Sequence, residues 1–367
     1  MKVLSLLGGD GCARNLDAEL SSARSKFSPA QHHEAYAVLA RIGTPLARSL
    51  LAKHALLSPW RDRNERIDGL LGSSLPEDAL LALDVDPDRV PLDYGPRAFR
   101  VLVDEHLQPW VVDEGKKRTP KLPKPTKKDD AIKAAAAAAA FDALRLDLDD
   151  HRQTALVGLE RAMAAGRTWN LERLRRIVGH PLLGRLARRL VWEWLGSRFF
   201  RVAEDGTFAD ETDAALELTE EATVALAHPA RIPDAVRDGF HQILHDYAII
   251  QPFEQLQRES YRASDEERAA TELARFDGRR VASARLEGLL GARGWQHGGH
   301  TTMHKPIGEY LAVLEIPRRA VHARGATAAD QLGKVTLRGP AGPATFGALS
   351  AVQASELLRD LETLPSA

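Results

Sequence analysis

The chain has 367 residues, of which 28% are charged and 44% are hydrophobic, and its formal net charge is −1. This ordinary balance gives no overall attraction to nucleic acid or to a membrane surface, and the length suffices for one large domain or two to three smaller ones. The single cysteine, Cys12, excludes an intrachain disulfide. Because a reducing compartment fits that composition and no apolar run approaches the roughly 20 residues that span a bilayer, we expect a cytoplasmic protein without membrane contact.

Residues 12–57 have the spacing of helical hairpins. Tyr36 and Ala40 recur at a helical interval, Gly43 ends that helix, and Pro45 begins the next one. Paired short helices of this kind are similar to HEAT-type repeats. The following segment is interrupted by prolines, which predicts short elements only: helices around 62–71 and 76–83, and a helix or strand near 97–107.

The composition changes sharply at residues 113–130, which combine seven Lys or Arg with three prolines. Such a segment favours an extended, solvated loop and marks the clearest internal boundary. Asp129 and Asp130 then stand where an N-cap and a first-turn acid belong, and an alanine run predicts a helix through about Leu146.

The remainder of the chain alternates between helical and strand periodicity. The predicted helices cover 151–167, 170–178, a further one starting at Leu182, 232–247, 265–291 and 350–362. The predicted strands cover 191–195, 199–203, 207–209, 215–218, 223–227, 309–316 and 332–338, with a hairpin turn at 204–206.

These patterns predict an α+β fold that is predominantly α. HEAT-like helical hairpins (1–112) are followed by the lysine–proline loop (113–130). A helical body (131–262) then contains a small antiparallel sheet at about 190–228, and a C-terminal α/β segment covers 263–367.

Seven ordered blocks suggest a family. They are LDYGPRAF (92–99), LPKPTKKDD (122–130), RTWN (167–170), HPLLGRLARRLVW (180–192), FRVAEDGTFAD (200–210), AHP (227–229) and DYAIIQPFEQLQR (246–258). Together they resemble the C-terminal portion of MolR-like proteins, a family named after a supposed molybdate-metabolism regulator and often found with WGR modules. The resemblance implies no settled activity, no cofactor and no catalytic residue to carry across.

Charge is unevenly distributed along the chain. Residues 161–189 contain eight arginines and one acid, whereas residues 202–230 contain eight acids and neither Lys nor Arg. The two runs either neutralise each other or leave a basic face for an acidic protein partner or nucleic acid. The candidate binding residues on the loop and the helices are Lys124, Lys127, Lys128, Arg167, Arg173, Arg176, Arg185, Arg188 and Arg189.

Histidine-rich positions supply the other candidates. A cleft assembled only in the fold would draw on His180, His228, His241, His245, Asp246, Gln251 and Arg258. His297, His300 and His304 form a weak candidate metal site whose spacing matches no specific zinc motif, and hydrogen-bonded structural roles are the alternative for both groups. Since position 242 is Gln, the pair His241 and His245 lacks the glutamate of HExxH.

No phosphate loop, nucleophile elbow or cysteine pair is present, so no complete catalytic motif can be assigned. The leading hypothesis is a non-enzymatic interaction or regulatory protein that binds an acidic protein partner through a basic helical face. Nucleic-acid binding is the first alternative, and an enzyme whose site assembles only in the fold is the second.

Overall fold

The computed structural model describes residues 8–22, 27–57, 67, 70, 81, 90–113, 118–196, 198–299, 301–317 and 329–365. Of these residues, 42% are helical and 21% lie in strands, which form four sheets. The prediction of a predominantly helical chain is therefore wrong. The strands are only two to six residues long, and pairing with partners elsewhere in the chain outweighs the helix propensity of their alanine, leucine and arginine residues.

Three helices form the N-terminal part: α2 (Asp10–Ser21), α3 (Pro29–Ile42) and α4 (Pro45–Leu57). Ser28 begins α3 with a capping box, and Gly43, at φ +65°, ends it. Each helix contacts the other two around one shared core. The HEAT-like prediction is wrong, because the described helices close on this core instead of stacking as repeated pairs. The helices expected around 62–71 and 76–83 lie almost entirely outside the described residues.

A small antiparallel sheet follows, with strands in chain order: β1 (Leu92–Asp93), β2 (Ala98–Val103), β3 (Pro109–Val112) and β4 (Arg118–Thr119). Buried and exposed residues alternate along β2, as expected of a strand that covers a core with one face. The segment near 97–107 is thus a strand and a turn. β4 lies inside the lysine–proline segment, and residues 120–130 contain no helix or strand.

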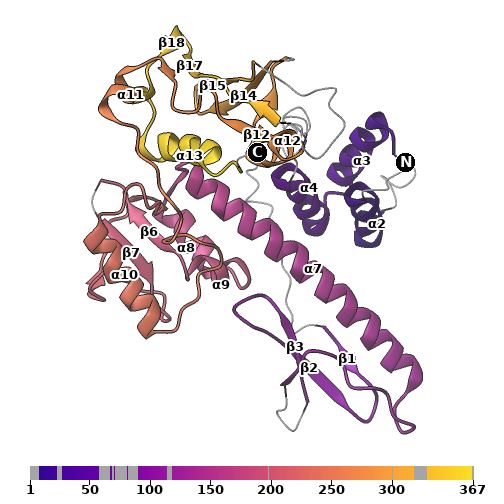
Figure 1. The fold of residues 1–367 in the computed structure, drawn as a ribbon. Coiled ribbons are helices and arrows are strands. Elements are labelled where there is room, and N and C mark those ends of the chain that lie inside the picture. The colour runs from indigo at the N-terminus through magenta and orange to yellow at the C-terminus, as the bar shows by residue number, and fades with distance from the viewer. Residues whose placement is uncertain are drawn as a thin grey trace.

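The long helix α7 (Ala131–Ala164) has 34 residues and a length of about 51 Å at 1.5 Å per residue. Asp130 is its N-cap and accepts from the amides of Ile132 and Lys133. The predicted interruption between Leu146 and residue 151 is absent. Figure 1 shows α7 running diagonally from the β1–β4 sheet to the C-terminal part of the chain, past the N-terminal helices.

The central sheet confirms the predicted run of strands between residues 191 and 227. Its helices are α8 (Leu171–Gly179), α9 (Leu183–Ala187) and α10 (Asp234–Asp246). Its strands, in the order β5-β10-β6-β7-β8-β9, are β5 (Thr168–Asn170), β10 (Thr223–Leu226), β6 (Val191–Trp194), β7 (Arg198–Val202), β8 (Phe208–Ala209) and β9 (Ala215–Leu216). Neighbouring strands are antiparallel, and β10 returns to pair between β5 and β6.

The C-terminal part is also a sheet with helices. Its helices are α11 (Asp265–Ala269), α12 (Ser283–Ala292), the 3₁₀ turn η2 (Phe346–Ala348) and α13 (Ala351–Glu362). Its main sheet runs β11 (Glu272–Leu273), β17 (Val335–Gly339), β15 (Tyr310–Glu315), β14 (Thr302–Ile307), β13 (Gln296–His297), with β18 (Gly342–Ala344) also on β17. A separate pair joins β12 (Arg280–Ala282) and β16 (Ala329–Gln331).

The single helix predicted over 265–291 is wrong. Gly278, at φ +83°, turns the chain, and the residues on either side pair with β17 and β16 from the end of the sequence. The strands predicted near 309–316 and 332–338 and the closing helix are confirmed by β15, β17 and α13.

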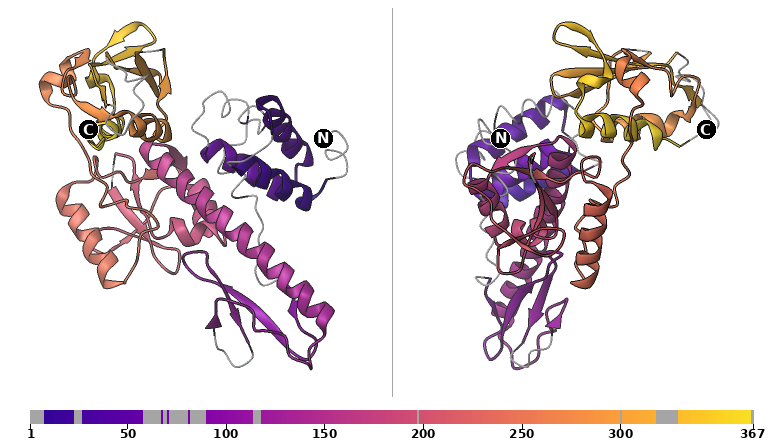
Figure 2. Two further views of the ribbon diagram at one scale, coloured as in Figure 1. Left: turned by 45° about the vertical axis from the view of Figure 1, so that its right-hand side comes forward. Right: turned by 90° about the vertical axis from the view of Figure 1, so that its left-hand side faces the viewer.

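The largest core lies where α7 crosses the β1–β4 sheet, α8, α9 and the inner face of the central sheet. The C-terminal part and the N-terminal helices each have their own core, and a smaller one lies under α10. Figure 2 shows these parts arranged along α7. In the described residues no helix is both long enough and apolar enough to cross a bilayer.

Candidate functional site

An open pocket of about 470 Å³ lies at the C-terminal end of α10. Its lining residues come from the last turns of α10 and the loop that follows: His241, Leu244, His245, Ile249, Ile250, Gln251, Phe253, Glu254 and Gln257. We call this pocket the α10 groove. It combines aliphatic side chains, one aromatic ring and two imidazoles.

The local fold of α10 explains how these side chains come together. Phe240 and Ile243 are buried against the central sheet, which fixes the orientation of the helix. His241 and His245 are four residues apart and therefore lie on one face of α10. After the helix, the amide of Ile249 donates to the carbonyl of Leu244 (2.8 Å), which folds the loop back along α10.

Arg189, just after α9, joins the groove to the β2–β3 turn. Its Nη1 donates to the carbonyl of Ile250 (2.8 Å) and its Nη2 to the carbonyl of Glu105 (2.6 Å). Its Nε donates to the carbonyl of Arg185 (3.0 Å), so all three guanidinium nitrogens hold backbone oxygens. Burial lowers the pKa of Arg189, and the nearby carboxylates of Glu105 and Asp104 oppose that shift.

Arg185 and Arg188 are held in the same way. Arg185 donates to the carbonyls of Pro181 (3.0 Å) and Val103 (2.7 Å). Arg188 donates to the carbonyls of Val178 (2.8 Å) and Glu204 (3.3 Å). Within the described part of the chain neither arginine pairs with a carboxylate, and the Nη2 of each has no hydrogen bond. Two fixed positive charges with unused donors therefore stand beside Arg189.

Backbone strain is concentrated around this region. Among the described residues, the non-glycine positions with positive φ are Leu107 (59°), Asp213 (62°) and Ala248 (51°). Leu107 lies in the β2–β3 turn that Arg189 binds, and Ala248 lies between α10 and Ile250. Asp213 accepts from the hydroxyl of Tyr247. A left-handed conformation costs an L-residue roughly 1–2 kcal/mol, and such strain clusters at functional sites.

Tyr247 is exposed at the end of α10 and is held on two sides. Its hydroxyl donates to Asp213 Oδ2 (2.7 Å), and the guanidinium of Arg201 lies 4.8 Å from its ring centroid. Hydrogen bonds from Tyr247 and Arg201 lower the pKa of Asp213. Tyr247 is 53% exposed and Ile250 is 65% exposed, so two large apolar side chains stand in solvent at this end of α10.

The seven sequence-predicted cleft residues fall into three places. His241, His245 and Gln251 line the groove, and Asp246, beside it, accepts from Gln242 Nε2 (2.7 Å). His180 Nδ1 accepts from the amides of Leu182 and Leu183 at the start of α9. His228 and Arg258 lie in a buried network elsewhere.

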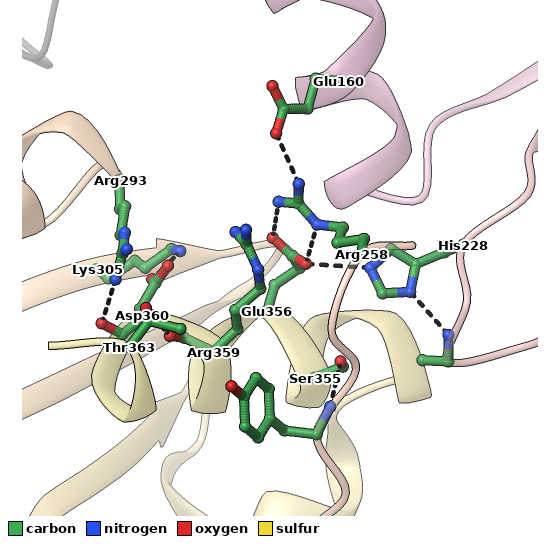
Figure 3. Close-up of polar contacts among 12 residues, drawn as sticks. Glu160, His228, Arg258, Arg293, Lys305, Ser355, Glu356, Arg359, Asp360 and Thr363 are labelled. Atoms are coloured by element: carbon green, nitrogen blue, oxygen red, sulfur yellow. Dashed lines mark hydrogen bonds and ion pairs between the residues drawn. The ribbon is translucent and has the colours of Figure 1, made fainter. Parts of the chain in front are cut away.

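This network joins α7, the central sheet and α13 (Figure 3). Arg258 donates to both oxygens of Glu356 (2.8 and 2.7 Å) and to Glu160 on α7 (2.6 Å). His228 Nδ1 accepts from the amide of Ala230, so its Nε2 carries the proton and donates to Glu356 (3.0 Å). Burial raises the pKa of Glu356, but the hydrogen bonds from Arg258 and His228 outweigh it and hold that pKa well below its usual value.

Sequence reasoning missed Glu356, although α13 contains a signal. Glu356 and Asp360 are four residues apart on a helix face that also buries Val352. An acid at such a position requires a partner. Glu356 finds Arg258, and Asp360 accepts from Trp295 Nε1 (2.8 Å) and from Lys305.

The lysine loop and the α9 arginines do not form one continuous face. Arg97 holds the loop by donating to Asp129 (2.5 Å) and to the carbonyl of Lys124 (3.4 Å). Arg185 binds Val103 at the other end of the same strand. Six strand residues span about 20 Å, which separates the two groups of positive charge.

The other predicted basic residues have varied surroundings. Lys124, Lys127, Lys128 and Arg176 are exposed. Arg167 and Arg173 are half-buried and have interactions of their own. Arg175, also on α8, pairs with Glu220 of the acidic run (3.0 Å).

No metal cluster appears in the part of the chain that the structure describes. His297 is exposed, and in the strand register it faces Met303 rather than His304. Burial and the charge of Arg338 lower the pKa of His304. His300 lies outside the described residues.

Comparison with known proteins gives a family match without a function. The sequence model of a family described as "Domain of unknown function (DUF4132)" matches residues 115–295. The chain is similar to the uncharacterized protein YehI of Escherichia coli (strain K12), with 28% identity over 331 residues. That alignment covers 85% of this chain and 27% of YehI, so the chain spans about a quarter of the length of this curated relative. No solved structure matches the chain.

These matches correct the family resemblance drawn from the sequence blocks. The resemblance to MolR-like proteins is wrong, because the matching family is DUF4132 and the comparisons show neither a MolR-like nor a WGR family. The blocks at 122–130, 167–170, 180–192, 200–210, 227–229 and 246–258 all fall within the DUF4132 match, so they belong to that family's pattern.

Proposed function

We propose that this chain is a non-enzymatic binding protein that recognises an acidic segment of a protein partner at the α10 groove and the adjoining α9 arginines. Carboxylates of the partner would accept from Arg185 and Arg188, and an apolar side chain of the partner would enter the groove beside Ile250. Arginine suits this role because its planar fork binds carboxylates in a bidentate manner.

The observation that carries the proposal is the way in which Arg185 and Arg188 are held. Backbone carbonyls orient each guanidinium but do not neutralise its charge. Because the side chains are already ordered, a partner loses less conformational entropy in binding them than it would with free arginines. The strained positions Leu107 and Ala248 support the same region, since strain is retained where the arrangement matters.

The groove adds apolar surface next to these charges. Leu244, Ile249 and Phe253 line it, and Ile250 is exposed at its rim. An acidic segment with one aliphatic or aromatic residue therefore complements both features. Nucleic acid complements the charges only, and Tyr247 is the exposed aromatic residue of this region that a base could stack upon.

A fluorescence-anisotropy titration with short peptides that combine Glu or Asp with one Leu or Phe tests the proposal. Arg185→Gln and Ile250→Asp should each weaken binding by about tenfold or more, as expected for a central contact. Arg176→Gln is the matched control, because it removes an exposed arginine of α8 that the groove does not include.

Three results would contradict the proposal. One is the absence of saturable binding to any acidic peptide, and another is equal weakening by Arg176→Gln and Arg185→Gln. The third is binding of duplex DNA with a steep salt dependence together with no peptide binding, which would favour the nucleic-acid alternative.

A further inference from the structure

The first half of α7 has two apolar faces. The inner face packs into the largest core through Ala134, Ala137, Phe141, Leu144 and Leu148. The opposite face is in solvent and consists of Ile132, Ala135, Ala136, Ala139 and Leu146. We call this second set the outer stripe. Ile132 is 83% exposed and Leu146 is 62% exposed.

No described element covers the outer stripe. Figure 1 and the left view of Figure 2 show the β1–β4 sheet on one side of this half of α7 and open space on the other. The N-terminal helices contact α7 only further along, where Arg14 binds Asp147 and Lys53 binds Asp150 (3.1 Å).

The spacing of the outer stripe is that of a helix-packing seam. Ile132, Ala139 and Leu146 follow one another at intervals of seven residues, which keeps them on one line of the helix. The two large side chains stand seven residues on either side of Ala139, and the positions between them are mostly alanine. A helix with this pattern is complementary to itself when a second helix runs in the opposite direction.

We propose that α7 is the interface of a homodimer in which the outer stripes of two copies pack antiparallel about a two-fold axis at Ala139. In that arrangement Ile132 of each copy packs against Leu146 of the other. The alanines let the helix axes approach to about 8 Å. A two-fold interface requires one patch that fits itself, and the symmetry of the stripe about Ala139 satisfies that requirement.

The charges beside the stripe support the antiparallel direction. Before α7, the exposed lysines are Lys121, Lys124, Lys127 and Lys128. Along residues 142–150, the charged side chains are Asp142, Arg145, Asp147, Asp149 and Asp150. An antiparallel pair sets each lysine loop against the acidic segment of the other copy, whereas a parallel pair sets lysine against lysine. Part of the acidic charge is already paired within the chain, so the contribution of these contacts decreases with salt.

The expected dimer is weak and reversible. A contact along about four turns of helix buries less than the roughly 800 Å² per partner of a standard interface. The overlap ends near residue 147, where the N-terminal helices begin to contact α7, so the two copies do not compete with that packing. We therefore expect a dissociation constant of the order of micromolar.

Sedimentation velocity over about 1 to 200 µM, a range that brackets such a constant, tests the proposal on the full chain. Ile132→Asp and Leu146→Asp should each weaken the dimer by about tenfold or more. Ile250→Asp is the matched control, because its side chain is as exposed (65%) but lies at the α10 groove. Both stripe positions are exposed, and an acid in the first turn suits a helix N-terminus, so these variants should keep the monomer's thermal midpoint.

Cysteine cross-linking in a Cys12→Ser background fixes the direction. With diamide as oxidant, Ala139→Cys should form a disulfide dimer, and so should the double variant Ile132→Cys with Leu146→Cys. Neither Ile132→Cys nor Leu146→Cys alone should do so, because each faces the other position. A parallel pair would cross-link all three single variants, and that result overturns the proposal. A monomer at every concentration, or a dimer that tolerates Leu146→Asp, overturns it as well.

Discussion

The substitution Glu356→Gln should destabilise the protein strongly although it changes almost no volume. Arg258 and Glu356 have side chains only 7% and 11% exposed, and the two are joined by a two-pronged ion pair. Glutamine removes the charge and keeps one oxygen as an acceptor. Breaking a buried pair from one side costs about 3–5 kcal/mol. Because one hydrogen bond can persist, we expect a loss near the lower end, about 3 kcal/mol in the free energy of unfolding.

Glu160→Gln provides the matched control. Glu160 binds the same guanidinium (2.6 Å), but its side chain is 41% exposed. Solvent screening limits the contribution of such a partner to about 1 kcal/mol or less. Urea unfolding of both variants, followed by far-UV circular dichroism and by tryptophan fluorescence, measures the two losses under the same conditions.

The pH dependence gives a second check on the same residue. The folded-state pKa of Glu356 lies below its ordinary value of 4.5. A group of this kind contributes stability above its unfolded pKa and loses that contribution as the pH falls toward the folded pKa. The difference between the parent protein and Glu356→Gln should thus be constant above about pH 5 and shrink below it. Equal losses for the two variants, or a difference still growing as the pH falls below 4.5, would refute this reasoning.

Three further substitutions test other parts of the fold. His151 is 1% exposed, neither ring nitrogen has a hydrogen-bond partner, and burial together with His180 lowers its pKa to about 3. His151→Leu should remove a stability loss of about 2 kcal/mol that the parent protein suffers between about pH 8 and pH 5, seen in urea titrations at both values. Asp17→Asn should cost the N-terminal helices about 2 kcal/mol by weakening the bonds from Lys53 (2.7 Å) and His54 (2.9 Å), seen as faster amide exchange in α2 and α4. Gly184→Ala should cost about 1–3 kcal/mol, because a Cβ there collides with a backbone carbonyl of α8, and an unchanged thermal midpoint would contradict this packing.

Features that depend on a few neighbouring residues were predictable from the sequence. The N-cap Asp130, the stop at Gly43 and the strands on either side of the turn at Gly206 follow from local propensities that the fold does not oppose. The helix predicted over 265–291 failed for the complementary reason. Leu273 and Val281 pair with strands about 50 to 60 residues further along the chain, and nothing in their own segment encodes those partners.

The candidate site was predictable only in part. The pattern of His241 and His245 on one helix face, followed by the loop at Gln251, placed three residues at the groove. The sequence could not show that arginines after Leu182 bind carbonyls from the β2–β3 turn, since 82 residues separate Arg185 from Val103. The partner of Arg258 is similarly remote, at a separation of 98 residues.

The continuity of α7 restricts how related sequences can change in length. Inserting one residue near its middle would rotate everything beyond that point by about 100° and shift it by 1.5 Å along the axis. Residues such as Phe141 and Leu159 lie on opposite sides of such a point and belong to the same core. The helix therefore acts as a ruler whose length is fixed. Insertions and deletions should accumulate in connections such as the lysine–proline loop and be rare between residues 141 and 159 of α7.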